Sequence, residues 1–184
     1  MSVVTWLKRE PQTTVGIALT IIQMLLGYIV VTASMIALIE LIGSLVGFDA
    51  AYIDAYISAE SARSGQKSAG MSLSWYWVTV VAIVVPLEEF VFRAVPLYLA
   101  ARINQHHPSR IVLVAIISSV MFGRAHGGWD CVLIVGMAGL MYSALYLKCG
   151  GMRGAFWKPL LAASLAHFGW DCTTLVVSFM WLGT

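Results

Sequence analysis

The stretch Glu88-Glu89-Phe90-Val91-Phe92-Arg93 places three charged residues inside an apolar run of the chain. Between Ser74 and Ala101 no other residue is charged. A charged side chain at the centre of a bilayer costs about 2.5–3.5 kcal/mol on insertion scales, so three unpaired charges would strongly disfavour a membrane span. Charged residues within a span usually mark a functional site among helices, and we predict such a site here.

The composition is that of a polytopic membrane protein. Of the 184 residues, 60% are hydrophobic and only 11% are charged, whereas soluble domains carry about 25% charged residues. The apolar segments are continuous rather than alternating, which favours helices over a β-barrel. We therefore predict an all-α transmembrane bundle that forms one domain over residues 1–184, with the lipid bilayer as its surroundings. The net charge of +2 is too small to indicate a nucleic-acid partner.

We predict five transmembrane helices, each in a continuous apolar segment. They cover residues from about 15 to 46, 73 to 101, 111 to 126, 132 to 147 and 160 to 182. The third and fourth are short and close together, as in a helical hairpin. Pro86 and Pro96 lie within the second, where they free backbone carbonyl groups and are expected to kink the helix. The first apolar segment is longer than the roughly 7–15 residues of a signal peptide, so we predict that it is retained.

Basic residues in the connections predict the orientation of the chain. They lie before the first span, after the second and after the fourth, at Lys8, Arg9, Arg102, Arg110, Lys148, Arg153 and Lys158. With five spans these three positions fall on the same side of the membrane. Since basic connections stay inside, we predict a cytoplasmic N-terminus and an external C-terminus. The polar segment 48–72 is then an external loop, and the core that carries the motifs covers about residues 73–172.

The candidate site residues lie on three of the predicted helices. Glu89 and Arg93 are four residues apart and can pair within one helix. Glu88 projects about 100° away from Glu89, without an obvious partner in its own helix, so it is the candidate for chemistry. His167 and Asp171, also four residues apart, share one face of the last helix.

His126 ends the third predicted span, in a segment that recurs later in the chain. Residues 125–131 read AHGGWDC and residues 166–172 read AHFGWDC. The repeat arises by chance or from similar helix packing, or it marks two related half-sites that face one cavity. In the second case each copy supplies one histidine to the site. Trp170 lies deeper than the tryptophans near the span ends, and we predict that it lines the substrate cavity.

Two mechanisms are open for these residues. A carboxylate beside a neutral histidine can hold and deprotonate a water molecule, as Glu88 and His126 would. Glu88, His126 and His167 could instead hold a divalent metal ion such as zinc, which would activate the water. The sequence has no HExxH motif, so the spacing of the residues does not decide between the two.

Three segments resemble the motifs of the CPBP family, which contains the CAAX proteases and the bacteriocin-processing, Abi-like intramembrane proteases. That family carries EExxxR, FxxxH and HxxxN or HxxxD-like motifs on separate helices, and the segments that match here are 88–93, 122–126 and 167–171. The resemblance implies an intramembrane endopeptidase. Its substrate would be a membrane-anchored protein or peptide, such as a C-terminal sorting tail or a leader, and its location the cytoplasmic membrane of a bacterium or archaeon.

The resemblance also implies a role for each residue. Glu88 and His126 would activate the water, while His167 and Asp171 would form the oxyanion site. The geometry would be supported by Glu89, Arg93 and Phe122. The family is described both as metalloproteases and as metal-free glutamate proteases, so the zinc alternative stays open.

The chain departs from the better-known family members in two ways. Asp171 stands where those enzymes have Asn, and a carboxylate cannot donate a hydrogen bond unless it is protonated. The chain also has fewer predicted spans than the prenyl-protein proteases, which argues against a CAAX substrate. Two other functions remain: a non-proteolytic scaffold or immunity protein on the same fold, and a proton-coupled carrier that uses Glu, His and Asp as a relay.

Overall fold

The computed structural model describes residues 3–11, 13–46, 75–104, 106–127 and 129–182, and every regular element in these ranges is helical. The helices are α1 (Val3–Lys8), α2 (Thr14–Val46), α4 (Trp75–Glu89), α5 (Val95–Ile103), α6 (Pro108–His126), α7 (Trp129–Lys148) and α8 (Trp157–Leu182). A π-helical turn, η1, occupies Phe90–Ala94, and a 3-10 turn, η2, occupies Gly151–Arg153. The predicted external loop, 48–72, lies outside the described residues.

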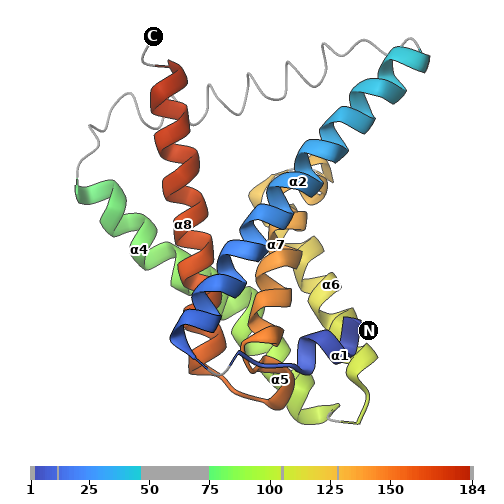
Figure 1. Ribbon diagram of the computed structural model, residues 1–184, viewed down its shortest axis with the longest axis vertical. Coiled ribbons are helices and arrows are strands. Elements are labelled where there is room, and N and C mark those ends of the chain that lie inside the picture. The colour runs from blue at the N-terminus through green and yellow to red at the C-terminus, as the bar shows by residue number, and fades with distance from the viewer. Residues whose placement is uncertain (1–2, 12, 47–74, 105, 128, 183–184) are drawn as a thin grey trace.

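Each of the five predicted segments is helical, and the second consists of α4, η1 and α5 in continuous succession. Figure 1 shows α7 in the middle of the bundle, with α2, α6 and α8 around it and α5 beneath. Within the described residues, Pro108–His126 and Cys131–Lys148 are each long and apolar enough to cross a membrane. Large apolar side chains are exposed on the outside of several helices, as expected where lipid is the solvent. The count of five spans stays a prediction.

The predicted kink in the second span takes the form of the π-helical turn η1. Pro86 lies inside α4, whereas Pro96 lies in the first turn of α5, two residues after the end of η1. Because Pro96 has no amide hydrogen, the carbonyl of Phe92 loses its usual donor four residues later. The Ser118 hydroxyl on α6 donates to that carbonyl instead. This hydrogen bond ties η1 to α6, close to the charged stretch.

Helices α6 and α7 form the predicted hairpin and approach each other closely at glycines. A Cβ atom on Gly123 would lie 2.7 Å from the Cα atom of Val132 and 2.9 Å from the nitrogen of Gly136. Farther along, the hydroxyls of Ser119 and Ser143 are 3.3 Å apart across the same contact. Small residues on facing helices let the two backbones meet in this way.

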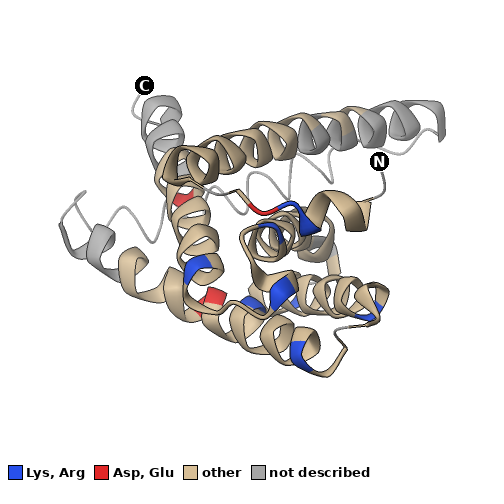
Figure 2. Cartoon of the chain, turned by 60° about the horizontal axis from the view of Figure 1, so that its bottom comes forward, with Lys and Arg blue, Asp and Glu red and all other residues tan. Residues whose placement is uncertain are grey.

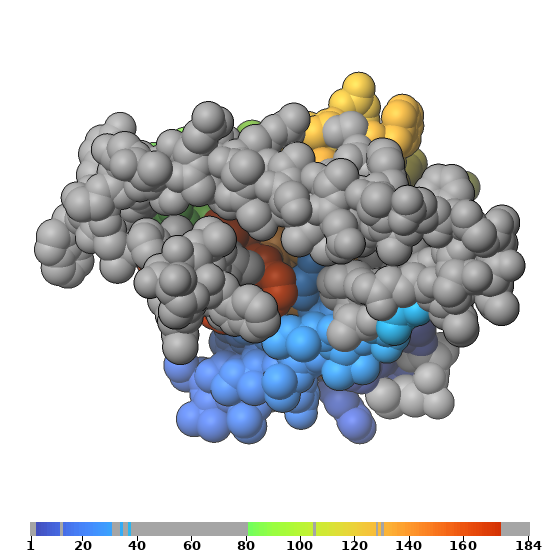
Figure 3. All heavy atoms as spheres, turned by 90° about the horizontal axis from the view of Figure 1, so that it is seen from above, coloured from blue at the N-terminus to red at the C-terminus, as the bar shows by residue number. Residues whose placement is uncertain are grey.

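Two clusters of buried side chains hold the bundle together. The first, at the lower end in Figure 1, joins α1, α5, α6, α7 and the start of α8, and includes Leu97, Ile111 and Tyr146. The second joins α2, α7 and α8, and includes Tyr28 and Tyr142. Seen from above, α8 (red) lies beside α2 (blue) (Figure 3). The candidate site residues lie where these helices meet α4.

The N-terminal segment is fastened to the connection between α7 and α8. The Lys158 ammonium donates to the Glu10 carboxylate at 2.5 Å, and the Arg153 guanidinium lies 3.5 Å from the same carboxylate. Lys148 donates to the carbonyl of Trp6 at 2.6 Å. Figure 2, which turns this end of the bundle forward, shows basic residues on several of the segments that meet there.

Candidate active site

Glu89 and Arg93 form a wholly buried ion pair at the start of η1. Arg93 Nη1 donates to Glu89 Oε1 at 3.0 Å, and neither side chain has any exposed surface. The guanidinium carbon lies 3.9 Å from the centre of the Phe122 ring, in a cation–π contact. Gly139 on α7 leaves room for this arrangement, because a Cβ there would lie 2.7 Å from Arg93 Nη2. The pairing predicted from the four-residue spacing is confirmed.

His167 on α8 is fixed by the same carboxylate. Its Nδ1 atom lies 2.8 Å from Glu89 Oε1. Since an ionised carboxylate only accepts hydrogen bonds, Nδ1 carries the hydrogen and Nε2 faces the other way. The imidazole also stacks on the Tyr142 ring, with centroids 4.6 Å apart and 20° between the planes. The orientation of His167 therefore depends on α4 and α7 as well as on its own helix.

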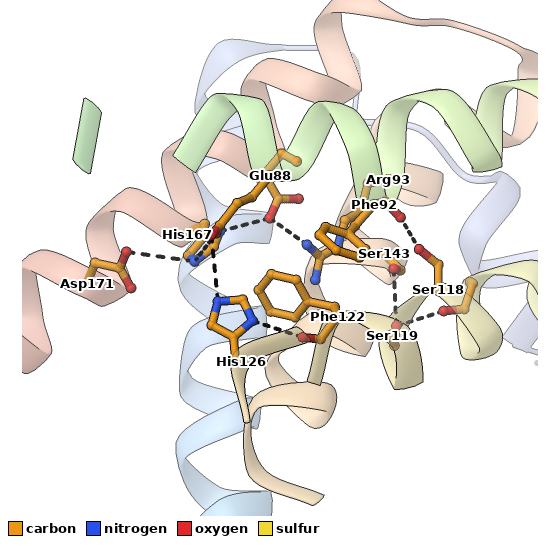
Figure 4. Close-up of polar contacts among 12 residues, drawn as sticks. Glu88, Phe92, Arg93, Ser118, Ser119, Phe122, His126, Ser143, His167 and Asp171 are labelled. Atoms are coloured by element: carbon orange, nitrogen blue, oxygen red, sulfur yellow. Dashed lines mark hydrogen bonds and ion pairs between the residues drawn. The ribbon is translucent and has the colours of Figure 1, made fainter. Parts of the chain in front are cut away.

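Glu88 lies between two imidazoles from different helices (Figure 4). Its Oε1 atom is 3.7 Å from His126 Nε2, and its Oε2 atom is 3.9 Å from His167 Nε2. The Glu88 side chain is 27% exposed, in contrast to its buried neighbour Glu89. The neighbouring carboxylates therefore face different surroundings, as the rotation of about 100° per residue predicts.

His126 lies in the last turn of α6, and its ring is oriented by the backbone. The Nδ1 atom is 2.8 Å from the carbonyl of Phe122, so Nδ1 is the donor and Nε2 is left toward Glu88. The Phe122 ring packs against the imidazole at a centroid distance of 4.3 Å. About a third of the His126 side chain is exposed.

Asp171 lies one turn beyond His167 on α8. Its Oδ2 atom is 3.7 Å from His167 Nε2, the same nitrogen that faces Glu88. The Asp171 side chain is 35% exposed. Two carboxylates therefore flank one imidazole nitrogen, each at a distance that leaves room for a third group between them.

The candidate residues surround a cavity of about 590 Å³. Its polar wall contains Glu88, His126, His167 and Asp171. The remaining wall is largely apolar and aromatic, and it is made of Tyr28, Val81, Val84, Val85, Phe122, Ile134, Val135, Ala138, Tyr142 and Trp170. An apolar cavity with a few convergent polar groups is the usual form of an active site. The structure brings all the predicted residues together, and their catalytic roles stay predictions.

The repeated segments differ in backbone structure. The copy at 125–131 covers the end of α6, a break at Gly127 and the start of α7. The copy at 166–172 lies entirely within α8. Trp129 is 72% exposed, whereas Trp170 packs edge-on against Tyr28 at 4.8 Å. Each copy supplies a histidine to Glu88, but the two segments are not structurally equivalent.

Glu88, His126 and His167 are the residues that would hold a metal ion, and their two imidazoles face different oxygens of the Glu88 carboxylate, at 3.7 and 3.9 Å. The zinc alternative stays a prediction. Over the described ranges, no group of three or more His, Cys, Asp or Glu side chains is placed to hold a metal ion.

Sequence reasoning missed two tyrosines of the site, Tyr28 and Tyr142. Tyr142 stacks on the His167 ring. Tyr28 on α2 contacts Trp170 and donates to the carbonyl of Ile134 at 3.2 Å. The sequence signal for each was a tyrosine, with its polar hydroxyl, in the middle of an apolar helix. That signal does not say which way the side chain points.

The comparisons with known proteins agree with these motifs. The model of a protein family described as type II CAAX prenyl endopeptidase Rce1-like matches residues 70–173. This segment is more than half of the chain and contains every candidate residue on α4, α6 and α8. No curated protein and no solved structure matches the chain. The protein is therefore a member of the Rce1-like type II CAAX prenyl endopeptidase family, a family of proteases, and an all-helical integral membrane protein.

Proposed function

We propose that the chain is an intramembrane endopeptidase that cleaves a membrane-anchored protein or peptide by means of a water molecule activated by Glu88 and His126. The observation that carries this proposal is the position of the Glu88 carboxylate, between Nε2 atoms from α6 and α8 in the wall of a cavity. The family match supports a protease, and the geometry supports these residues as its polar centre.

The hydrogen-bonding roles of Glu88 and His126 favour a water molecule between them. Glu88 as a carboxylate only accepts, and His126 Nε2 is also an acceptor because Nδ1 carries the hydrogen. Two acceptors 3.7 Å apart do not hydrogen-bond to each other, but one water can donate a hydrogen to each. Its oxygen lone pairs then point into the cavity, toward a substrate carbonyl.

The reaction follows from this position. The water oxygen attacks the carbonyl carbon, and Glu88 takes the proton that the water loses. The new C–O bond leaves a negative charge on the carbonyl oxygen. Glu88 then returns the proton to the amide nitrogen as the C–N bond breaks. Water and one peptide bond become a carboxylic acid and an amine, with no covalent intermediate on the protein.

The other residues position the reacting groups. Glu89 and Arg93 hold the Nδ1 side of His167, so that Nε2 faces the cavity. In its protonated form His167 can donate from Nε2 to the developing oxyanion. Asp171 lies beside that nitrogen and favours the positive charge. Phe122 packs against both His126 and Arg93, and Trp170 forms part of the wall for the substrate.

The proposed orientation has five spans, a cytoplasmic N-terminus and an external C-terminus, in the cytoplasmic membrane of a bacterium or archaeon. It is supported by the N-terminal segment, which contacts the basic connection between α7 and α8 at one end of the bundle. His126, in the cavity wall, lies at the opposite end of α6 from Ile111, which belongs to the buried cluster at this end. In this orientation the site is open to the outer half of the bilayer, where an anchored tail can enter.

The proposal is tested with purified protein in lipid nanodiscs and two probe peptides. One is a farnesylated peptide with a C-terminal CAAX sequence, and the other is an unprenylated peptide with an apolar C-terminal tail. We expect the wild-type chain to cleave at least one probe, as seen by intact mass. Glu88→Gln and His126→Ala should each reduce the rate roughly 100- to 10,000-fold, because each removes a partner of the water.

His106→Ala is the matched control, because His106 is exposed and lies outside the cavity wall. It should cleave at the wild-type rate. All variants should keep the wild-type melting temperature within a few degrees. Cleavage by Glu88→Gln at the wild-type rate would show that this carboxylate does not activate the water.

A further inference from the structure

Tyr142 is a wholly buried residue whose hydroxyl has no hydrogen-bond partner among the described residues. Tyr146, the tyrosine one turn later on α7, is also wholly buried. Its hydroxyl, however, lies 3.3 Å from the carbonyl of Ala155 and 3.5 Å from that of Ala94. Buried hydroxyls in proteins are nearly always paired, since an unpaired one lowers stability. An exception in one of two similar tyrosines needs an explanation.

The position of Tyr142 supplies one. Its ring stacks on the His167 imidazole, and the residue lies in the cavity wall with Glu88 and Asp171. A phenol hydroxyl is a donor while it is neutral, whereas an ionised Asp171 is not. The site therefore holds an unused neutral donor beside the histidine proposed to face the oxyanion.

We propose that the Tyr142 hydroxyl is a hydrogen-bond donor for the carbonyl oxygen of the substrate, and that it supplies the neutral donor that Asp171 as a carboxylate lacks. This inference rests on the proposed function. During attack by the water the carbonyl oxygen gains negative charge, and the hydroxyl stabilises it together with His167. The hydroxyl makes its bond only when substrate is bound, which accounts for its unpaired state in the free protein.

The first test compares Tyr142→Phe with Tyr146→Phe. Both substitutions remove one hydroxyl and keep a buried ring on α7. With the probe peptide that the wild type cleaves, Tyr142→Phe should lower kcat on the order of 100-fold, as loss of an oxyanion donor does elsewhere, with KM within about twofold. Tyr146→Phe should keep kcat within about twofold, and it should lower the melting temperature because it loses hydrogen bonds.

A second test asks whether a new donor restores activity. Asp171→Asn places an amide N–H one turn from His167, so Tyr142→Phe/Asp171→Asn should have a kcat at least about tenfold above that of Tyr142→Phe, one donor having been regained. A purely structural role for Tyr142 gives no reason for this gain. If the double variant is no faster than Tyr142→Phe, the inference is wrong.

The inference and the proposed function fail in different ways. A kcat within twofold of wild type for Tyr142→Phe, while Glu88→Gln is inactive, overturns the role of Tyr142 alone. Normal cleavage by Glu88→Gln overturns the proposed function. The role of Tyr142 is then overturned as well, because it assists the same reaction.

Discussion

Glu88 and Glu89 are neighbours with the same side chain, yet they lie in two different regions of the molecule. Glu89, Arg93 and Phe122 form the packed region, where every side chain is buried and the charges neutralise each other. Glu88, with His126 and Asp171, belongs to the open region, where about a quarter to a third of each side chain is accessible and the carboxylates lie 3.7–3.9 Å from the imidazole nitrogens that they face.

The difference shows how one helix supports both rigidity and chemistry. A buried ion pair is costly to break, because removing one partner leaves the other charge without water or counterion. The packed region therefore fixes His167 in one orientation. The open region has room for water and substrate, and its groups can change protonation during a reaction. His167 joins the two regions, with Nδ1 in one and Nε2 in the other.

The largest effect on stability should come from Arg93→Met. This variant leaves the Glu89 carboxylate buried without its guanidinium, and we expect a loss of about 3–5 kcal/mol in the free energy of unfolding. The measurement is chemical or thermal unfolding in detergent micelles. Glu88→Gln, in the open region, should change stability by less than about 1 kcal/mol. An equal loss in the free energy of unfolding for the two variants would show that the two regions do not differ in stability as described.

A smaller loss is expected when the packed region is crowded by one methyl group. In Gly139→Ala the new Cβ would lie 2.7 Å from Arg93 Nη2 and 2.9 Å from a ring carbon of Phe122. Such overpacking costs about 1–3 kcal/mol, and it should shift Arg93 and lower activity as well. Gly169→Ala is the control, since no atom lies within 4 Å of its Cβ. A neutral Gly139→Ala variant would mean that the packed region is more plastic than described.

A still smaller effect is expected far from both regions, at the N-terminal contact. Lys158→Met removes the ion pair with Glu10, in which the lysine side chain is 41% exposed. We expect a loss of at most about 1 kcal/mol, because water and salt screen an exposed pair. The loss should shrink further at high ionic strength, as followed by thermal unfolding in 0.05 and 0.5 M salt. A loss as large as that of Arg93→Met would place this contact among the main supports of the fold.

Metal chelation should have the smallest effect. If Glu88 and His126 activate the water without a metal ion, as proposed, dialysis against 1,10-phenanthroline should leave the cleavage rate within about twofold of its starting value. The check is probe cleavage before and after dialysis, together with the metal content of the sample. A loss of activity that zinc restores would instead make Glu88, His126 and His167 metal ligands.

Local features of this molecule were predictable from the sequence because they depend on spacing along one helix. The ends of all five helical segments lie within three residues of their predicted positions, since apolar runs and flanking polar residues mark them. The pair of Glu89 and Arg93 follows from four-residue spacing, and the outward rotation of Glu88 follows from its place one residue earlier.

Relations between helices were not predictable in the same way. The bond from His167 to Glu89 depends on how α8 is rotated against α4, which no pattern within either helix specifies. The stacking of Tyr142 on His167 likewise depends on the register of α7 and α8. The repeat likewise did not predict backbone structure, because two nearly identical segments form a helix break in one copy and a continuous helix in the other.

The turn η1 has a further consequence for how the chain tolerates insertions and deletions. A π-helical turn contains one more residue than the α-helical turn it replaces. Deleting one residue of η1 would restore a regular helix and rotate all of α4 by about 100° relative to α5. Leu87 would then take the place of Glu88, and Glu88 would take the place of Glu89 beside Arg93. The number of residues in this turn thus decides which side chain of α4 faces the cavity. Losing one residue would replace the reactive carboxylate by a leucine, while a glutamate would still pair with Arg93.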